Sequence, residues 1–157
     1  MESESTRRPE PPSGDSRSQP FLVVLLNEDK YFVTLALVNK IINPLEIFPL
    51  PDTPPYILGV ANFTGEIVPI VDLKKVLKIP PSGLAGQKKF LICKYRDLKV
   101  GFLVDNVLDA WDVDAGEFQT DTNRVLENDY IQAEYIHKGE VIGVIDVAAL
   151  ITDHQAR

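Results

Sequence analysis

Apolar residues along this chain gather in short runs that polar or glycine-containing turns separate. Four pairs of runs have the length and composition of strands joined as β-hairpins, and they are residues 21–26 with 31–37, 60–63 with 67–71, 90–95 with 99–104, and 130–137 with 141–145. Gly65 and Gly139 stand in two of the connecting turns, where glycine accepts a positive φ without strain. The pattern predicts a mainly β protein with short strands and many turns.

One thirteen-residue pattern occurs twice, at residues 65–77 and again at residues 139–151. Each copy reads Gly-Glu, an apolar run, an aspartate and a second apolar stretch. The run that opens at Phe21 also matches in length the run that opens at Phe90. Repetition of this kind predicts two similar β subdomains. Because a unit of about 60 residues buries only about 60% of its unfolded surface, the two should share a core.

Short helical segments are expected between the strands. Apolar residues within 35–42 recur at three- to four-residue spacing, which predicts a helical turn that Pro44 ends. Residues 53–59 combine a capping threonine, a proline in the first helical position and a glycine just past the end, and so predict a second helix. Residues 114–129 have weak periodicity and predict a long loop with some local helix.

Asp72 and Asp146 occupy equivalent places in the repeated pattern. Each carboxylate can accept hydrogen bonds from the free backbone N–H groups of the helical turn that follows. We therefore assign both aspartates as structural helix caps rather than as catalytic groups.

The chain is expected to begin with a disordered tail at residues 1–20, which hold four prolines, five serines and no aliphatic cluster. Such a segment cannot bury enough surface to offset its ordering entropy. Residues 80–87, rich in proline, glycine and serine, connect the repeats. We expect a first barrel over about 21–80 and a second over about 88–151, with exchange of strands between them left open.

Charge is unevenly distributed along the chain, whose formal net charge is −7. Residues 74–99 carry eight basic side chains against one acidic, whereas residues 109–129 carry seven acidic against one basic. The acidic balance opposes nucleic-acid binding, because affinity for phosphates depends on clustered Lys and Arg. The segregation can orient a partner electrostatically, or it can represent two solvated faces of an ordinary domain.

Few residues are candidates for catalysis or metal binding. Cys93, the only cysteine, lies in an apolar strand, where burial raises the pKa of a thiol and leaves it inert. His137 and His154 do not stand at metal-ligand spacing from it, and Trp111 is assigned to the core or the barrel rim. With no evident acid, base or nucleophile, we expect no enzyme, no metal and no cofactor.

Binding is the remaining class of function. No apolar stretch approaches the ~20 residues of a membrane helix, and residues 1–20 lack a secretion signal, so we expect a cytoplasmic protein without membrane insertion. A small-molecule-binding barrel would require a deep pocket with converging polar groups. A nucleic-acid-binding barrel would require aromatic residues interleaved with basic ones, for which residues 90–99 are the candidate.

The segment from Pro54 to Leu73 resembles the signature of the CheW-like family. It reads Pro-Pro-Tyr-Ile-Leu-Gly-Val-Ala-Asn-Phe-Thr-Gly-Glu-Ile-Val-Pro-Ile-Val-Asp-Leu, and the family has Gly-Val-x-Asn-Leu-Arg-Gly leading into Val-x-Pro-Val-x-Asp-Leu. The likeness extends outward to Phe21 and Asp146, which assigns residues 21–157 to a CheW-like domain. It implies two five-stranded SH3-like β-barrels packed together, with short helices, in agreement with the internal repeat.

Proteins of this family are non-enzymatic scaffolds that join a methyl-accepting chemoreceptor to a CheA-type histidine kinase. The resemblance therefore implies these two partners and recruitment to membrane receptor arrays. By position, the receptor-facing surface comprises Leu35, Val38, Lys40, Ile41, Thr64 and Gly65. Kinase-facing surfaces are implied at the outer ends of the barrels. Recognition would place a partner helix in an apolar groove whose rim charges select it.

Two of these positions depart from the family pattern. Lys40 stands where the family usually has glutamate, and Thr64 stands where it has arginine. If the family residues form an ion pair, losing both avoids an uncompensated buried charge, which costs roughly 3–5 kcal/mol. The fold should then survive while partner choice changes. The departures favour a divergent sensory or surface-motility array, such as one that controls pili, over the standard flagellar pathway.

Overall fold

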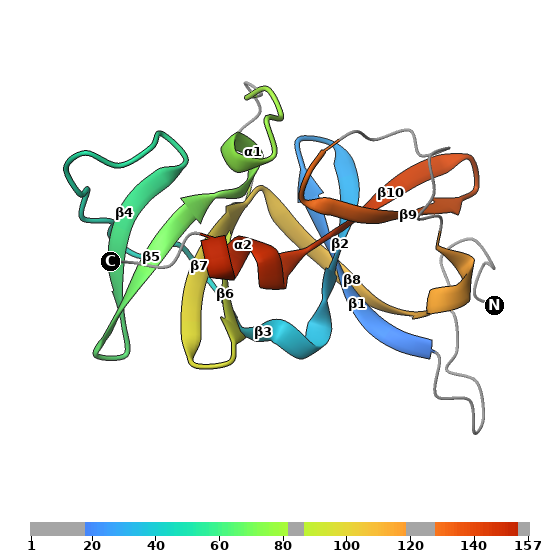
Figure 1. Cartoon of the computed structure of the whole chain (residues 1–157), viewed down its shortest axis with the longest axis horizontal. Helices are drawn as coiled ribbons and strands as arrows, with labels where there is room; N and C mark the ends of the chain where they lie inside the picture. Colours follow the sequence, from blue (N-terminus) through green and yellow to red (C-terminus); the bar gives the residue numbers. More distant parts are fainter. Residues whose placement is uncertain (1–17, 82–86, 119–127, 154–157) are drawn as a thin grey trace.

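Two five-stranded β-sheets make up the body of the protein, whose computed structural model describes residues 18–81, 87–118 and 128–153. In chain order the strands are β1 Ser18–Leu26, β2 Asp29–Thr34, β3 Val38–Ile42, β4 Ile57–Phe63, β5 Glu66–Asp72, β6 Lys89–Tyr95, β7 Leu98–Val104, β8 Asn106–Asp114, β9 Ile131–His137 and β10 Glu140–Ile145. The short helical segments are η2 Leu35–Leu37, α1 Leu73–Val76, η3 Ala115–Glu117 and α2 Val147–Asp153. Sheet A has the order β8-β1-β2-β10-β9, and sheet B has the order β3-β6-β7-β5-β4. The sheets lie side by side (Figure 1).

The predicted pair of packed five-stranded β subdomains is confirmed, but neither is a closed barrel. In sheet B, β3 and β4 are the two edges. The chain beyond β3 reaches β4 through a bridge in which the backbone groups of Phe48 and Val60 exchange hydrogen bonds of 2.8 and 2.9 Å. Sheet B therefore curls toward closure without a continuous ladder between its edges.

All four predicted hairpins are present among the described residues, each with a two-residue turn. In the turns Thr64-Gly65 and Lys138-Gly139 both residues have positive φ, at 50° and 88° in the first and 51° and 80° in the second. Positive φ at both positions is the type I′ geometry, which matches the twist of the flanking strands. Equivalent turns of the two repeats therefore share one conformation.

Each sheet takes strands from both halves of the sequence. The β1–β2 hairpin pairs with β8 on one side and, in parallel, with β10 on the other. The β6–β7 hairpin pairs with β3 on one side and, in parallel, with β5 on the other. The boundaries therefore differ from the expected 21–80 and 88–151, because the first hairpin of each repeat is exchanged into the sheet of the other repeat. Sheet B spans 38–104, and sheet A combines 18–34 with 106–145.

The exchanged hairpins are buried on both faces, because side chains along a strand alternate between faces. In β1, Phe21 and Val23 belong to a core inside sheet A, while Leu22 and Val24 belong to a core shared by the two sheets. The β6 strand repeats this alternation between a core inside sheet B and the same shared core. This double burial explains why the middle of each strand in both hairpins is apolar instead of alternating with polar residues, which stand toward the strand ends.

The two helices complete the shared core. They lie near the junction of the sheets in Figure 1, and their buried residues in that core are Leu73, Val76, Val147, Leu150 and Ile151. The expectation that the repeats share a core therefore agrees with the packing.

The prediction of a helical turn within residues 35–42 is correct only for residues 35–37 and is wrong for the rest. Only Leu35–Leu37 is helical, and Val38–Ile42 forms strand β3 against β6. The pairing register shifts between Val38 and Lys40. A β-bulge of this kind inserts one extra residue, so the apolar positions of a strand acquire a spacing that resembles a helix.

The helix expected at residues 53–59 is absent. The segment forms a turn, in which the Ile57 N–H donates to the Pro54 carbonyl at 3.0 Å, and then enters β4. Because Pro55 follows, Pro54 is disfavoured from helical geometry. Gly59 has a φ of +143°, and a Cβ there would lie 2.3 Å from the Phe48 carbonyl oxygen. Glycine is thus needed for the close approach of the bridging segment rather than as a helix end.

The disordered tail predicted for residues 1–20 is too long by at least three residues. Residues 18–20 are part of β1 and pair with β8. Pro20, which lacks an N–H, is accommodated because β2 ends opposite Phe21 and leaves one side of β1 unpaired there. Residues 1–17, most of the inter-repeat connection and residues 119–127 of the predicted loop lie outside the described residues.

Asp105, between β7 and β8, joins three distant parts of the chain. Its carboxylate accepts hydrogen bonds from the Asn27 N–H at 2.6 Å and from the ammonium groups of Lys74 at 2.9 Å and Lys88 at 3.0 Å. Desolvation acts to raise the pKa of Asp105, but the hydrogen bonds from Lys74, Asn27 and Lys88 outweigh it and hold the pKa below its usual value. One ionised carboxylate thus ties the β1–β2 turn and α1 to the start of β6.

Neither half of the chain should fold alone, because each half carries the central hairpin of the other half's sheet. Residues 18–81 and 87–153, prepared as separate polypeptides, should each give NMR spectra without amide dispersion. Mixed in equal amounts, they should recover the spectrum of the intact chain, since the hairpins can then bury both faces. A dispersed spectrum from either fragment alone, at the same total concentration, would contradict the exchange.

Replacing Asp105 by asparagine should lower the free energy of unfolding near neutral pH by about 2 kcal/mol, since charge-assisted hydrogen bonds contribute about 1.5–3 kcal/mol. The folded pKa lies below the unfolded value of about 3.9. The contribution of the ionised group is therefore complete above that value and is lost as the pH falls through the folded pKa. Asp105→Asn should accordingly lose less stability than the parent on acidification.

Urea unfolding across the acidic range measures this difference. Asp52→Asn is the matched control, because Asp52 is exposed and its positive φ of 60° suits asparagine. Equal acid sensitivity of the parent chain and Asp105→Asn would show that Asp105 does not stabilise the junction.

Candidate partner-binding surface

Four of the six predicted receptor-facing residues lie on η2 and β3, at one edge of sheet B. Leu35 and Val38 are partly buried and pack against the shared core. Lys40 is exposed, and Ile41 keeps 43% of its surface exposed. Of these four residues, Lys40 and Ile41 are therefore the two whose side chains are exposed for contact with a partner.

The other two residues form the β4–β5 turn. The Gly65 N–H donates to the Asn62 side-chain oxygen at 2.8 Å, and the Thr64 hydroxyl donates to the Phe63 carbonyl at 2.7 Å. These bonds hold the exposed turn in a fixed shape. The turn and β3 both lie along the lower side of Figure 1 with the β6–β7 turn between them, so the predicted residues share one end of sheet B without forming one contiguous cluster.

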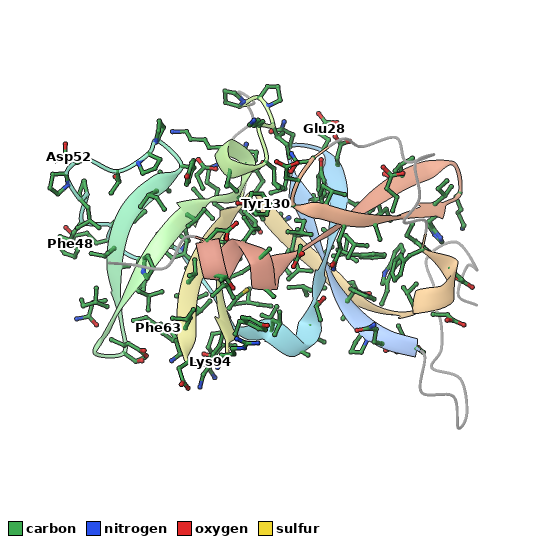
Figure 2. All side chains as sticks on the ribbon, in the orientation of Figure 1. Glu28, Phe48, Asp52, Phe63, Lys94 and Tyr130 are labelled. Carbon is green, nitrogen blue, oxygen red and sulfur yellow. The ribbon has the colours of Figure 1, made fainter. Side chains whose placement is uncertain are left out.

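Apolar side chains that were not predicted as binding residues are exposed on β5 of sheet B, at Ile67, and in the segment that bridges to β4, at Phe48. Phe48 is 51% exposed and Ile67 is 61% exposed, and Figure 2 shows Phe48 at the far left beside β4. In sheet A, Ile136 of β9 is 48% exposed. The sequence pattern that could have identified Ile67 is the unbroken apolar run at 67–71. A strand with one solvated face normally alternates apolar and polar residues, so such a run places an apolar side chain on the solvated face. Both sheets thus expose apolar side chains that a protein partner can contact.

The interior of sheet A contains an aromatic cluster and a shallow hollow. Trp111 packs edge-on against Phe32 and His137, with ring centroids 5.7 and 4.9 Å apart, which places it among the core aromatics as predicted. The hollow of about 320 Å³ is lined by Gln19, Phe21, Thr34, Phe118, Gln132, Ala133 and Val144. None of these side chains can act as an acid or a base near neutral pH.

Reactive groups do not converge in the described part of the chain. Cys93 is fully buried, and desolvation raises the pKa of its thiol to about 12, so the thiolate that reacts as a nucleophile does not form. Desolvation and a hydrogen bond to Asp153 raise the pKa of Tyr130 to about 12. Within residues 18–81, 87–118 and 128–153, no three His, Cys, Asp or Glu side chains gather as a metal site requires.

Asp72 and Asp146 stand at the starts of α1 and α2. The Asp72 carboxylate accepts the backbone N–H groups of Lys74 and Lys75 at 3.1 and 3.3 Å. The Asp146 carboxylate accepts the N–H of Ala149 at 3.1 Å. Both carboxylates therefore act as helix caps, since each accepts hydrogen bonds from backbone N–H groups at the start of a helix.

Three comparisons place the chain among known proteins. A family model described as CheW-like domain matches residues 20–155. The chemotaxis protein CheW of Bacillus subtilis (strain 168) is 28% identical over 135 residues, or 85% of this chain and 86% of that protein. The chemotaxis protein CheW of Treponema pallidum (strain Nichols) is 28% identical over 116 residues, or 71% of this chain and 66% of that protein. The crystal structure of the scaffolding protein TtCheW from Thermoanaerobacter tengcongensis matches with a TM-score of 0.74 and 23% identity, covering 82% of this chain and 88% of that chain.

Together, the sheets and their surfaces define a class: a duplicated β domain whose strands and hairpin turns carry exposed apolar and charged groups. The chain belongs to the CheW-like family, and the resemblance drawn from residues 54–73 is confirmed. No helix among the described residues is both long and apolar enough to cross a membrane.

Loss of the Asp72 cap should weaken α1 without changing the sheets. Asp72→Ala should lower the free energy of unfolding by about 1 kcal/mol, the usual effect of removing an N-cap side chain. Asp72→Asn should retain most of that stability, because its amide oxygen can still accept the two N–H groups. Urea unfolding of both variants tests the assignment, and an equal loss in both would point to the charge of Asp72 rather than to capping.

Proposed function

We propose that the protein is a non-enzymatic scaffold that couples a methyl-accepting chemoreceptor to a CheA-type histidine kinase. The observation that carries the proposal is the match of the CheW-like family model to residues 20–155. The surface supports it, because exposed apolar side chains on fixed strands suit protein docking, whereas the described residues bring no reactive groups together. Such a scaffold acts in the cytoplasm and is recruited to membrane receptor arrays by its partner.

The two partners take different surfaces in this proposal. The receptor contacts the end of sheet B formed by η2, β3 and the Thr64-Gly65 turn, where Ile41 supplies apolar contact and Lys40 supplies charge. The kinase contacts the β4–β5 side of sheet B, where Ile67 of β5 and Phe48 of the segment bridged to β4 are exposed. Separate surfaces allow one chain to hold both partners at once.

The receptor surface differs from the family pattern in its charge. Lys40 and Thr64 replace an acidic and a basic family residue, and both are exposed on different elements of sheet B. Exchanging rim charges changes which partners are excluded more than it changes the fold. We therefore infer a divergent sensory or surface-motility array, such as one that controls pili.

Co-purification from the native cell tests the proposal. The full chain should recover a histidine kinase that carries a CheW-like domain, together with a chemoreceptor. Ile67→Glu should lower kinase recovery at least about tenfold, because a charge placed at an apolar contact must be desolvated. Thr152→Glu, at an exposed position on α2, adds the same charge outside both sheets; it is the control and should leave kinase recovery unchanged.

The double variant Lys40→Glu with Thr64→Arg reports on the receptor surface. The variant should no longer co-purify with the chain's own receptor but should still recover the kinase, because both substitutions lie on the proposed receptor-binding surface. Recovery of the same receptor at the parent level would refute altered specificity, and recovery of neither partner by the parent chain would refute the coupling function.

A further inference from the structure

Three lysines from three strands converge at the lower end of sheet B. Ile92 of β6 points into the core of this sheet, so Lys94, two residues further, lies on the same face beyond the core. Lys40 of β3 is the cross-strand partner of Ile92, and Lys99 of β7 is the cross-strand partner of Lys94. Cross-strand partners share a face, so all three lysines lie on one face (Lys94 is labelled in Figure 2).

Only part of this charge is neutralised within the described chain. Lys99 forms an ion pair with Glu66 at 2.8 Å, and its ammonium lies 5.9 Å from the centroid of the Phe63 ring. Lys40 and Lys94 are exposed and form no ion pair with a described residue. With the exposed Arg96 and Asp97 of the turn between β6 and β7, this end carries four cationic side chains against two carboxylates. Like charges directly opposite each other in a sheet are destabilising. Carboxylates supplied by a binding partner would therefore reduce the repulsion at this end of the sheet.

The internal repeat shows that the fold itself does not require this excess. In sheet A the pair Lys30 and Glu140, 3.1 Å apart, occupies the place that Lys99 and Glu66 occupy in sheet B. The cross-strand partner of Lys30 is Leu25, where sheet B has Lys94. The ion pair is thus common to both sheets, whereas the additional lysine belongs to sheet B alone.

The rest of the surface suits a protein segment rather than a nucleic acid. Phe63 is partly exposed beside Lys99 and packs against the core inside sheet B, on the same face as the lysines, whereas Ile41 pairs with Leu91 and lies on the other face. Apolar contact surrounded by charge of one sign is typical of protein interfaces that select a partner electrostatically. The chain as a whole carries a net charge of −7, which opposes binding to a polyanion through long-range attraction.

We propose that this lysine end, formed by Lys40, Lys94 and Lys99 with Phe63, binds an acidic amphipathic helix of the receptor. Lys40 and Lys94 select that helix through its carboxylates, and Phe63 contacts its apolar side chains. The inference rests on the proposed coupling function and adds to it the charge of the segment that is recognised.

NMR titration of the full chain with two synthetic helices tests the inference. Both peptides have about 20 residues with a leucine stripe, and they differ only in four Glu residues beside the stripe that are Gln in the second peptide. At about 50 mM NaCl, where screening is weak, the Glu peptide should shift the amide signals of Lys40, Lys94 and Lys99. It should bind at least about tenfold more tightly than the Gln peptide, and the difference should shrink as salt is added.

Charge reversal supplies a matched pair of variants. Lys40→Glu with Lys94→Glu should weaken binding of the Glu peptide at least about tenfold. Lys75→Glu with Lys78→Glu changes the net charge by the same amount at exposed lysines in and just after α1, and it should change the affinity less than about twofold. The amide dispersion of each variant confirms that it remains folded.

Several outcomes would overturn the inference: equal affinity for both peptides, an equal effect of the two variants, or signal shifts away from the lysine end. Preferential binding of this end to vesicles with about 30% phosphatidylserine would assign it to an anionic lipid surface instead. Loss of peptide binding with kinase recovery intact would remove only this inference. Peptide binding without recovery of a kinase or a receptor would leave the lysine end as an acidic-peptide site and remove the coupling function.

Discussion

The structure depends on the burial of the two exchanged hairpins on both faces. A strand that is apolar on both faces has no solvated orientation, so β1–β2 and β6–β7 must each lie between two apolar layers. One layer lies inside the hairpin's own sheet, and the other is the shared core that the opposite hairpin and the two helices also enter. Neither sheet can separate from the other without exposing that shared core, and this fixes the relative position of the two sheets.

A fixed relation between the sheets is what the proposed coupling function requires. The shared core and the ion pairs at Asp105 hold the junction, so the features left for binding are the edge strands, the turns and the outer strands. Exposed apolar side chains lie on the edge strands β3 and β9, at Ile41 and Ile136, and on β5 beside the edge strand β4, at Ile67. Surfaces that are held rigidly lose little conformational entropy on binding, which favours affinity from a modest contact area.

The elements that were predicted correctly from the sequence are those that local interactions specify. The hairpins, the positive φ of Gly65 and the caps at Asp72 and Asp146 depend on residues within a few positions of each other. The helix expected at 53–59 failed because the effect of Pro55 on Pro54 outweighs a capping pattern. The helix expected beyond residue 37 failed because a bulge in β3 changed the apolar spacing.

The exchange of hairpins and the lysine end could not be predicted in the same way. The two hairpins are similar in length and apolar character, so each could pair within its own repeat or within the other, and the choice depends on contacts far apart in sequence. The lysine end follows from that choice, because it joins β3 of the first repeat to β6 and β7 of the second. In an unexchanged fold Lys40 would lie beside Leu25 and Lys30 in place of Lys94 and Lys99. The positive surface of sheet B is therefore a product of the exchange, and the same constraint that buries the core also assembles the charges available to a partner.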